Sequence, residues 1–144
     1  MKFLLILSLL IAFSSVQISG QASEAWCRCA LMVDTELMLY MVYDVGEAFI
    51  EACSEHDRCK NRCYDKIRAN TNEMDLWSHD ENGHTIGSSI CQYLFTNYNE
   101  EQFNNKYVHG YYQVCGGPWE YTFQDSQQML CCDLGVHQHC ITRN

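Results

Sequence analysis

The chain lacks several features that would otherwise define its class. Only one of its 144 residues is proline, Pro118, and no proline-rich linker, low-complexity tract or internal repeat divides it. It has 9 lysines and arginines against 18 aspartates and glutamates, for a formal net charge of −9. It therefore lacks the broad basic surface that nucleic-acid binding requires. No Asn-x-Ser/Thr sequon occurs, so N-glycosylation is not expected. These absences favour one acidic domain without a nucleic-acid partner.

Long apolar runs are also scarce, and the single one lies at the start of the chain. A short basic start precedes an apolar run from Phe3 to Phe13, and a small, polar segment follows to Gly20. This order is typical of a secretory signal peptide, and the run is too short to span a bilayer. We therefore expect residues 1–20 to be a signal peptide and residues 21–144 to form one soluble, secreted, extracellular domain.

Cysteine, in contrast, is abundant, and all of it follows the predicted signal peptide. In the oxidising secretory route, ten cysteines are expected to form five disulfides. Ten cysteines allow about 945 pairings, so spacing alone does not give the connectivity. The ten are Cys27, Cys29, Cys53, Cys59, Cys63, Cys91, Cys115, Cys131, Cys132 and Cys140.

The hydrophobic pattern predicts a mainly α protein with small β-wings. We expect a buried apolar helix from Asp34 or Thr35 to about Tyr43, and a stronger helix over residues 47–69. A third helix is expected over residues 88–103, and Ser126 can cap a final one. On the second of these helices, a helical projection turns both His56 and Asp57 toward the interior, about 100° apart.

Two turn signals separate these helices. Asn82-Gly83 is a good hairpin turn, and Gly116-Gly117-Pro118 breaks an aromatic-rich segment, residues 107–123, into a second hairpin or loop pair. Trp77 and Trp119 lie beside these turns, where an aromatic ring can meet a lipid interface. His137 and His139 alternate near the end of the chain, a position that favours solvation, and we assign them no ligand role.

The stretch Cys53-Ser54-Glu55-His56-Asp57-Arg58-Cys59 resembles the active-site helix of the secreted phospholipases A2, which reads Cys-x-x-His-Asp-x-Cys. Cys27-Arg28-Cys29 is similar to the Cys-x-Cys of that family's calcium loop, and Cys132-Asp133 to its Cys-Asp pair. The resemblance implies a divergent member, nearest the atypical invertebrate-venom groups. It implies a disulfide-rich fold of antiparallel helices with a small β-wing, bridged Cys29–Cys53 and Cys59–Cys132.

The resemblance also implies a mechanism, calcium-dependent hydrolysis of the sn-2 ester of glycerophospholipids at a membrane or micelle surface. His56 would take the proton of the attacking water, and Asp133 would orient the imidazole. Asp57 would bind the Ca²⁺ ion, the one cofactor implied. Backbone carbonyls around Arg28 to Met32 would complete the calcium shell.

Two alternatives remain open on the sequence. The positions after Cys29 are Ala30-Leu31-Met32-Val33, without the glycines that let carbonyls turn toward an ion. Their absence favours a catalytically silent phospholipase A2-like binding or toxin module that acts on a protein receptor or channel. The other alternative is an unrelated cysteine scaffold, such as an inhibitor, whose helix carries His-Asp by chance. Disulfide mapping separates this scaffold from the family.

Overall fold

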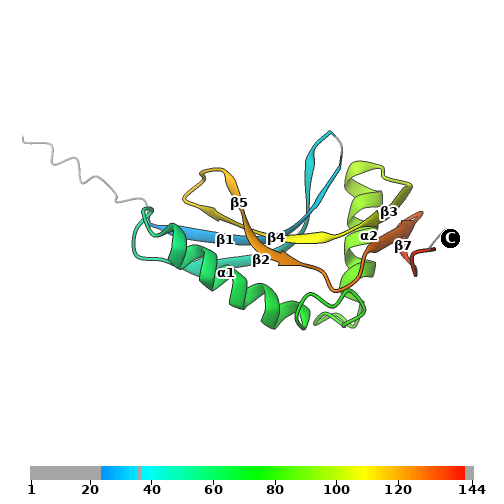
Figure 1. Ribbon diagram of the computed structural model, residues 1–144, viewed down its shortest axis with the longest axis horizontal. Coiled ribbons are helices and arrows are strands. Elements are labelled where there is room, and N and C mark those ends of the chain that lie inside the picture. Colours follow the sequence, from blue (N-terminus) through cyan, green and yellow to red (C-terminus); the bar gives the residue numbers. More distant parts are fainter. Residues whose placement is uncertain (1–23, 36, 142–144) are drawn as a thin grey trace, which may run out of the picture.

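The computed structural model describes residues 24–35 and 37–141, so the predicted signal peptide lies outside the described residues. The elements in chain order are β1 (Trp26–Asp34), β2 (Leu39–Phe49), α1 (His56–Thr71), α2 (Ile86–Tyr98), β3 (Gln102–Lys106), β4 (Val108–Val114), β5 (Trp119–Asp125), β6 (Leu130–Asp133) and β7 (Val136–His137). Figure 1 shows α1 lying along one side of the larger sheet, with α2 at the far end of the molecule.

The fold is mostly β, so the predicted mainly α class is wrong. Strands pair antiparallel in a four-stranded sheet of order β2-β1-β4-β5 and a three-stranded sheet of order β3-β6-β7. The phospholipase A2-like arrangement of antiparallel helices is therefore not the fold of this chain.

The predicted helix over residues 34–43 is wrong, because this segment turns and forms the start of β2. β1 pairs with β2 from Trp26↔Phe49 to Asp34↔Leu39. A short apolar run fits a buried strand as well as a buried helix, and here strand pairing decides between them. The chain thus forms a long hairpin where the sequence predicts a helix.

The predicted final helix from Ser126 is also wrong, because two adjacent cysteines there bridge in different directions. Cys132 bonds to Cys91 on α2, whereas Cys131 bonds to Cys140 in the C-terminal segment. Successive side chains of a strand point to opposite faces, which suits this divergence, and the segment is β6.

The other local predictions fare better. The helix predicted over residues 88–103 is confirmed in part as α2, which ends at Tyr98, so the predicted C-terminal end is wrong and β3 begins at Gln102. The hairpin predicted over residues 107–123 is confirmed as β4 and β5. Asn82-Gly83 lies in a turn where Gly83 has φ +81°. The helix predicted over residues 47–69 forms only in its later part, because β2 continues to Phe49 and α1 begins at His56.

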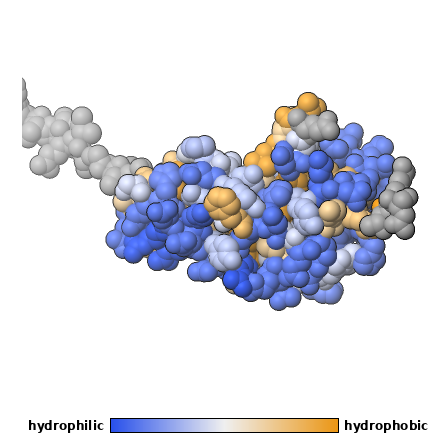
Figure 2. All heavy atoms as spheres, viewed as in Figure 1, coloured by the Kyte–Doolittle hydropathy of each residue, from blue (hydrophilic) through white to orange (hydrophobic). Residues whose placement is uncertain are grey.

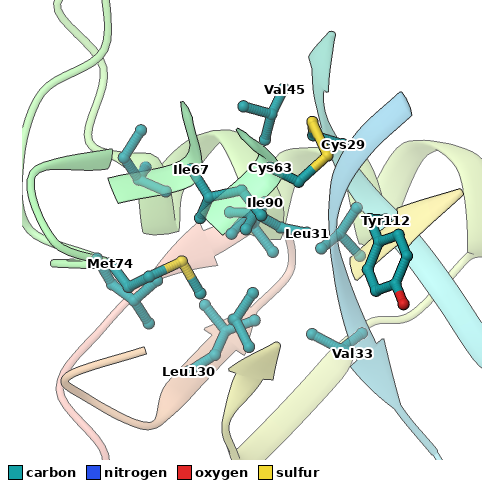
Figure 3. Packing of buried hydrophobic residues seen from close by; sticks show 14 of the residues in the cluster. Cys29, Leu31, Val33, Val45, Cys63, Ile67, Met74, Ile90, Tyr112 and Leu130 are labelled. Carbon is teal, nitrogen blue, oxygen red and sulfur yellow. A yellow bond between two sulfur atoms is a disulfide. The ribbon is translucent and has the colours of Figure 1, made fainter. Parts of the chain in front are cut away.

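β1 is one of the two inner strands of the larger sheet, and its residues from Cys29 to Val33 are all buried. Cys27, Cys29, Leu31 and Val33 alternate toward α1, and each is fully buried. The buried residues of α1 pack against this strand and share one face at four-residue spacing: Cys59, Cys63, Ile67 and Thr71. Figure 3 shows the Cys29–Cys63 bridge beside Leu31, Ile67 and Ile90 in this core.

The five expected disulfides are confirmed, but the pairing implied by the resemblance is wrong. Cys29 bonds to Cys63 rather than Cys53, and Cys59 bonds to Cys27 rather than Cys132. The full set is Cys27–Cys59, Cys29–Cys63, Cys53–Cys115, Cys91–Cys132 and Cys131–Cys140. This density of bridges is typical of extracellular proteins. Within the described residues, no helix is long and apolar enough to cross a membrane.

Gly110 on β4 is tightly packed between β5 and α1. A Cβ at this position would lie 2.7 Å from Thr122 Oγ1 and 3.0 Å from Ile67 Cδ1. We expect Gly110→Ala to lower the free energy of unfolding by about 1–3 kcal/mol, because the crowded atoms must shift. Urea unfolding with the disulfides intact measures this loss. Asn61→Ala on the exposed side of α1 is the control and should change stability by about 0.5 kcal/mol or less. Equal stability of the two variants would contradict the packing.

Candidate functional site

His56 is the first residue of α1, and a carboxylate on another element holds its imidazole. His56 Nδ1 lies 2.9 Å from Glu120 Oε1, and the Tyr112 hydroxyl donates to Glu120 Oε2 at 2.9 Å. The His56 side chain remains 50% exposed, so water reaches the ring. A chain of hydrogen bonds from His56 through Glu120 to Tyr112 thus joins the start of α1 to the β4–β5 hairpin.

The sheet register and one disulfide position this chain of groups. Tyr112 on β4 and Glu120 on β5 are directly opposed cross-strand partners, which brings the hydroxyl to the carboxylate. The Cys53–Cys115 bridge ties the segment before α1 to the turn between these strands. Within that segment, the Glu55 carboxylate accepts a hydrogen bond from the backbone N–H of Glu51 at 2.7 Å. The disulfide and this hydrogen bond therefore hold the backbone that leads into His56.

Hydrogen bonding and burial shift the pKa values of Glu120 and Tyr112. The donated hydrogen bonds of Tyr112 and then His56 lower the pKa of Glu120, because they stabilise the ionised carboxylate. Burial raises the pKa of Tyr112 to about 12, and the neighbouring carboxylate adds to the rise. At neutral pH, Glu120 is ionised and accepts from both neighbours.

The structure does not bring the three predicted site residues together. Asp133 is an exposed residue of β6, at the end of the molecule opposite the start of α1 (Figure 1), and the carboxylate on His56 is Glu120 instead. Asp57 is exposed at the second position of α1. The predicted inward lean of His56 and Asp57 is wrong, because the helix starts at His56 and both side chains are exposed there.

The residues present do not fit the calcium site that the resemblance implies. Arg28 to Met32 belong to β1, whose backbone pairs with β2 on one side and with β4 on the other. Carbonyls engaged in two ladders do not converge on Asp57, and calcium needs six to eight oxygen ligands. Across the described chain, the one group of clustered metal-ligand types is Cys27, Cys29 and Cys63, whose sulfurs are bonded in disulfides.

An exposed apolar tip caps the β1–β2 hairpin, where the sequence predicts a buried helix. Leu37 is 90% exposed, Met38 54% and Leu39 39%. Figure 2 shows apolar atoms gathered at this raised point of the molecule. Large apolar side chains clustered at one protruding point mark an interaction site. We call these three residues the hairpin tip.

The two tryptophans predicted to meet lipid do not reach such a point. Trp77 is half-buried and stacks on His137, with ring centroids 4.0 Å apart. Trp119 is half-buried at the start of β5, opposite Gln113. The exposed apolar surface therefore lies on the hairpin tip instead.

Sequence reasoning missed both Glu120 and the hairpin tip. Glu120 lies 64 residues from His56 in the sequence, and only the tertiary register makes them neighbours. One feature of the sequence did indicate a turn at the hairpin tip: Thr35 precedes it, and threonine hydroxyls stabilise short turns.

Comparison with known proteins gives no match: no protein-family model, no curated protein and no solved structure is similar to this chain.

Tyr112→Phe tests how the Tyr112 hydroxyl affects the pKa of Glu120. We expect the pKa of Glu120 to rise toward its ordinary value, because the largest cause of its lowering is removed. A carboxyl whose pKa is lowered by folding stabilises the protein above its unfolded pKa, and this contribution is lost as the pH falls through the folded pKa. The variant should therefore lose less stability on acidification than the native protein.

A carboxyl-carbon NMR titration of Glu120, with urea midpoints at neutral and acid pH, measures both effects. Tyr107→Phe, at an exposed tyrosine between β3 and β4, is the matched control and should leave Glu120 unchanged. A Glu120 titration identical in all three proteins would show that the hydroxyl bond does not matter.

Proposed function

We propose that the protein is a secreted, disulfide-stabilised binding protein that inserts its hairpin tip into an apolar cleft of another extracellular protein. The observation that carries the proposal is the 90% exposure of Leu37 at the point of a protruding hairpin. Leaving such a side chain in water forgoes about 1.5–3 kcal/mol of burial, and a docked partner recovers it.

The turn that presents the hairpin tip is held by its own hydrogen bonds. The Thr35 hydroxyl donates to the Met38 carbonyl at 2.8 Å and accepts from the Met38 N–H at 3.1 Å. The Thr35 N–H also donates to the Met38 carbonyl, at 2.9 Å. At the other end of the strand, two disulfides fix β1 to α1. A preorganised tip loses little conformational entropy on docking, so more of its burial appears as affinity.

Surface tyrosines and charge favour a protein over a lipid surface as the partner. The β1–β2 hairpin rises on the side of the larger sheet away from α1, and so does the β4–β5 turn (Figure 1). Tyr111 and Tyr121, near neighbours on this sheet, have ring centroids 5.6 Å apart, and tyrosine is enriched at binding hot spots. The net charge of −9 opposes binding to anionic lipid.

A photo-crosslinking amino acid at position 37 tests the proposal in an extract of the tissue that secretes the protein. The same probe at Leu134, which is 59% exposed on the turn after β6, is the matched control. We expect a protein adduct at position 37 and not at 134. The captured protein is then purified, and it should bind Leu37→Asp about 10–150-fold more weakly than the native chain, while Leu134→Asp binds normally.

Two outcomes would overturn the proposal. One is a purified partner that binds native protein and Leu37→Asp equally. The other is flotation with phosphatidylcholine vesicles that is lost in Leu37→Asp, which would assign the hairpin tip to lipid.

A second proposal retains the sn-2 ester hydrolysis predicted from the sequence, with Glu120 in the position assigned to Asp133. It is favoured by the 2.9 Å contact between His56 Nδ1 and Glu120, because a carboxylate there orients the imidazole. The other ring nitrogen of the half-exposed His56 would take a proton from water. No step in this proposal passes through a calcium ion.

Fatty-acid release from phosphatidylcholine vesicles tests the hydrolysis, in calcium and in chelator. We expect His56→Gln to lower the rate at least about 100-fold and Glu120→Gln to lower it less, because the first removes the base and the second only its orientation. Asp133→Asn is the control and should retain the native rate. Release that survives His56→Gln would end this proposal. A rate that requires both calcium and Asp57 would contradict the geometry described above.

A further inference from the structure

A pocket of about 600 Å³ lies between α2 and β7, away from His56 and from the hairpin tip. Its volume is within the range of small-ligand sites. The exposed side of α2 supplies one wall, and the turn between β6 and β7 supplies the other. Gly135 has φ +80° in this turn and lies against Phe95 of α2, which keeps the turn close to the helix. The principal lining side chains are Ser88, Gln92, Tyr93, Thr96, Asn97 and His137.

His137 is the unusual member of this pocket. It is 8% exposed, so the predicted solvation is wrong, and neither of its ring nitrogens has a hydrogen-bond partner among the described residues. One face of the ring stacks on Trp77, and a Cβ at Gly87 would lie 2.3 Å from the imidazole. A buried polar group without a partner costs about 1–3 kcal/mol, and native proteins rarely leave one. The imidazole therefore indicates a partner that the described residues do not supply.

Burial also fixes the form of this imidazole. Desolvation lowers the pKa of His137, and the nearby His139 adds to the lowering. The ring is therefore neutral at physiological pH, with one nitrogen that donates and one that accepts. A hydroxyl group, which both donates and accepts, matches either nitrogen.

The pocket wall has the same neutral character. Among the described residues, side chains with hydroxyl or amide groups dominate it, no carboxylate, lysine or arginine lines it, and His84 is the one histidine besides His137. Gln92 Nε2 donates to Thr96 Oγ1 at 3.0 Å, and Asn97 Nδ2 donates to the Tyr93 carbonyl at 3.1 Å. These bonds leave the amide oxygens of Gln92 and Asn97 and the Thr96 hydroxyl proton for a ligand.

The start of α2 does not offer an anion site in this pocket. Gly87 N–H donates to the Leu76 carbonyl at 2.8 Å, and Ser88 N–H donates to Thr85 Oγ1 at 3.1 Å. Donors already paired cannot cradle a phosphate or carboxylate. Charge, polarity and pairing thus all favour an uncharged ligand with many hydroxyls.

We propose that this pocket binds a neutral, hydroxyl-rich ligand of the chemical class of an unmodified sugar residue. The free amide oxygens of Gln92 and Asn97 accept from its hydroxyls, and Tyr93, 37% exposed at the pocket edge, packs on its apolar face. Both ring nitrogens of His137 are closed off from solvent in the ligand-free protein, so a hydroxyl or a water carried with the ligand pairs His137 only when the ring or its neighbours shift on binding. This binding is independent of the protein-binding role proposed for the hairpin tip.

A panel of glucose, galactose, mannose, N-acetylglucosamine and their disaccharides, titrated to about 10 mM, tests the proposal by NMR. We expect at least one member to shift the amide signals of α2 and the imidazole ¹⁵N signals of His137. Gln92→Ala and Asn97→Ala should each weaken this binding about tenfold, because each removes an acceptor. Asn61→Ala on the exposed side of α1 is the control and should leave it unchanged.

The imidazole signals separate a binding site from a merely structural histidine. A ligand that pairs His137 changes its ¹⁵N shifts, whereas sugar bound elsewhere on the surface does not. The proposal fails if no member of the panel shifts α2, or if binding survives Gln92→Ala and Asn97→Ala. It also fails if only the sulfated forms of these sugars bind, since that result would assign the pocket to anions.

Discussion

The pair of disulfides between β1 and α1 is the constraint on which the rest of the structure depends. Cys27–Cys59 and Cys29–Cys63 join alternate residues of a strand to residues one helical turn apart, and Cys27 Sγ lies 3.4 Å from Cys63 Sγ. Alternate residues of a strand share one face, and helix residues four apart share one side. Both bridges can therefore form only when α1 lies along β1 on one face of the sheet. With that face covered, β2, β4 and β5 extend the sheet around a core already fixed at its centre.

This constraint also explains why His56 contacts Glu120. Once Cys59 and Cys63 set the axis of α1, its first turn lies over the β4–β5 hairpin, and Cys53–Cys115 fixes the preceding segment there. The His-Asp dipeptide is thus placed by the same cysteines that suggest an active-site helix in the sequence, but these cysteines bond elsewhere. A short motif fixes local chemistry, whereas the partners of its cysteines decide which distant residues complete a site.

Local features of the fold were predictable from the sequence where the signal was local. Apolar periodicity gives most of α2, although its cap, Thr85, lies before the predicted start, and Gly116-Gly117-Pro118 turns the chain between β4 and β5. The segments before residue 50 and after residue 126 were not predictable, because their apolar runs fit a buried helix and a buried strand equally well. Non-local pairing and the disulfide pattern settle that choice, as they settle the partner of His56. The site could be predicted only as far as the single residue His56.

Five bridges also explain how a small protein tolerates two features that lower its stability. An exposed apolar hairpin tip and a buried histidine with no hydrogen-bond partner among the described residues each cost on the order of 1–3 kcal/mol, a large part of the stability of an ordinary domain. Each disulfide contributes about 2–4 kcal/mol by restricting the unfolded chain, without any contact at the tip or at His137. Stability held in the β1–α1 core thus leaves the hairpin tip and the α2 pocket free to meet other requirements. Both of these features lie on segments outside that core, where a binding role would place them.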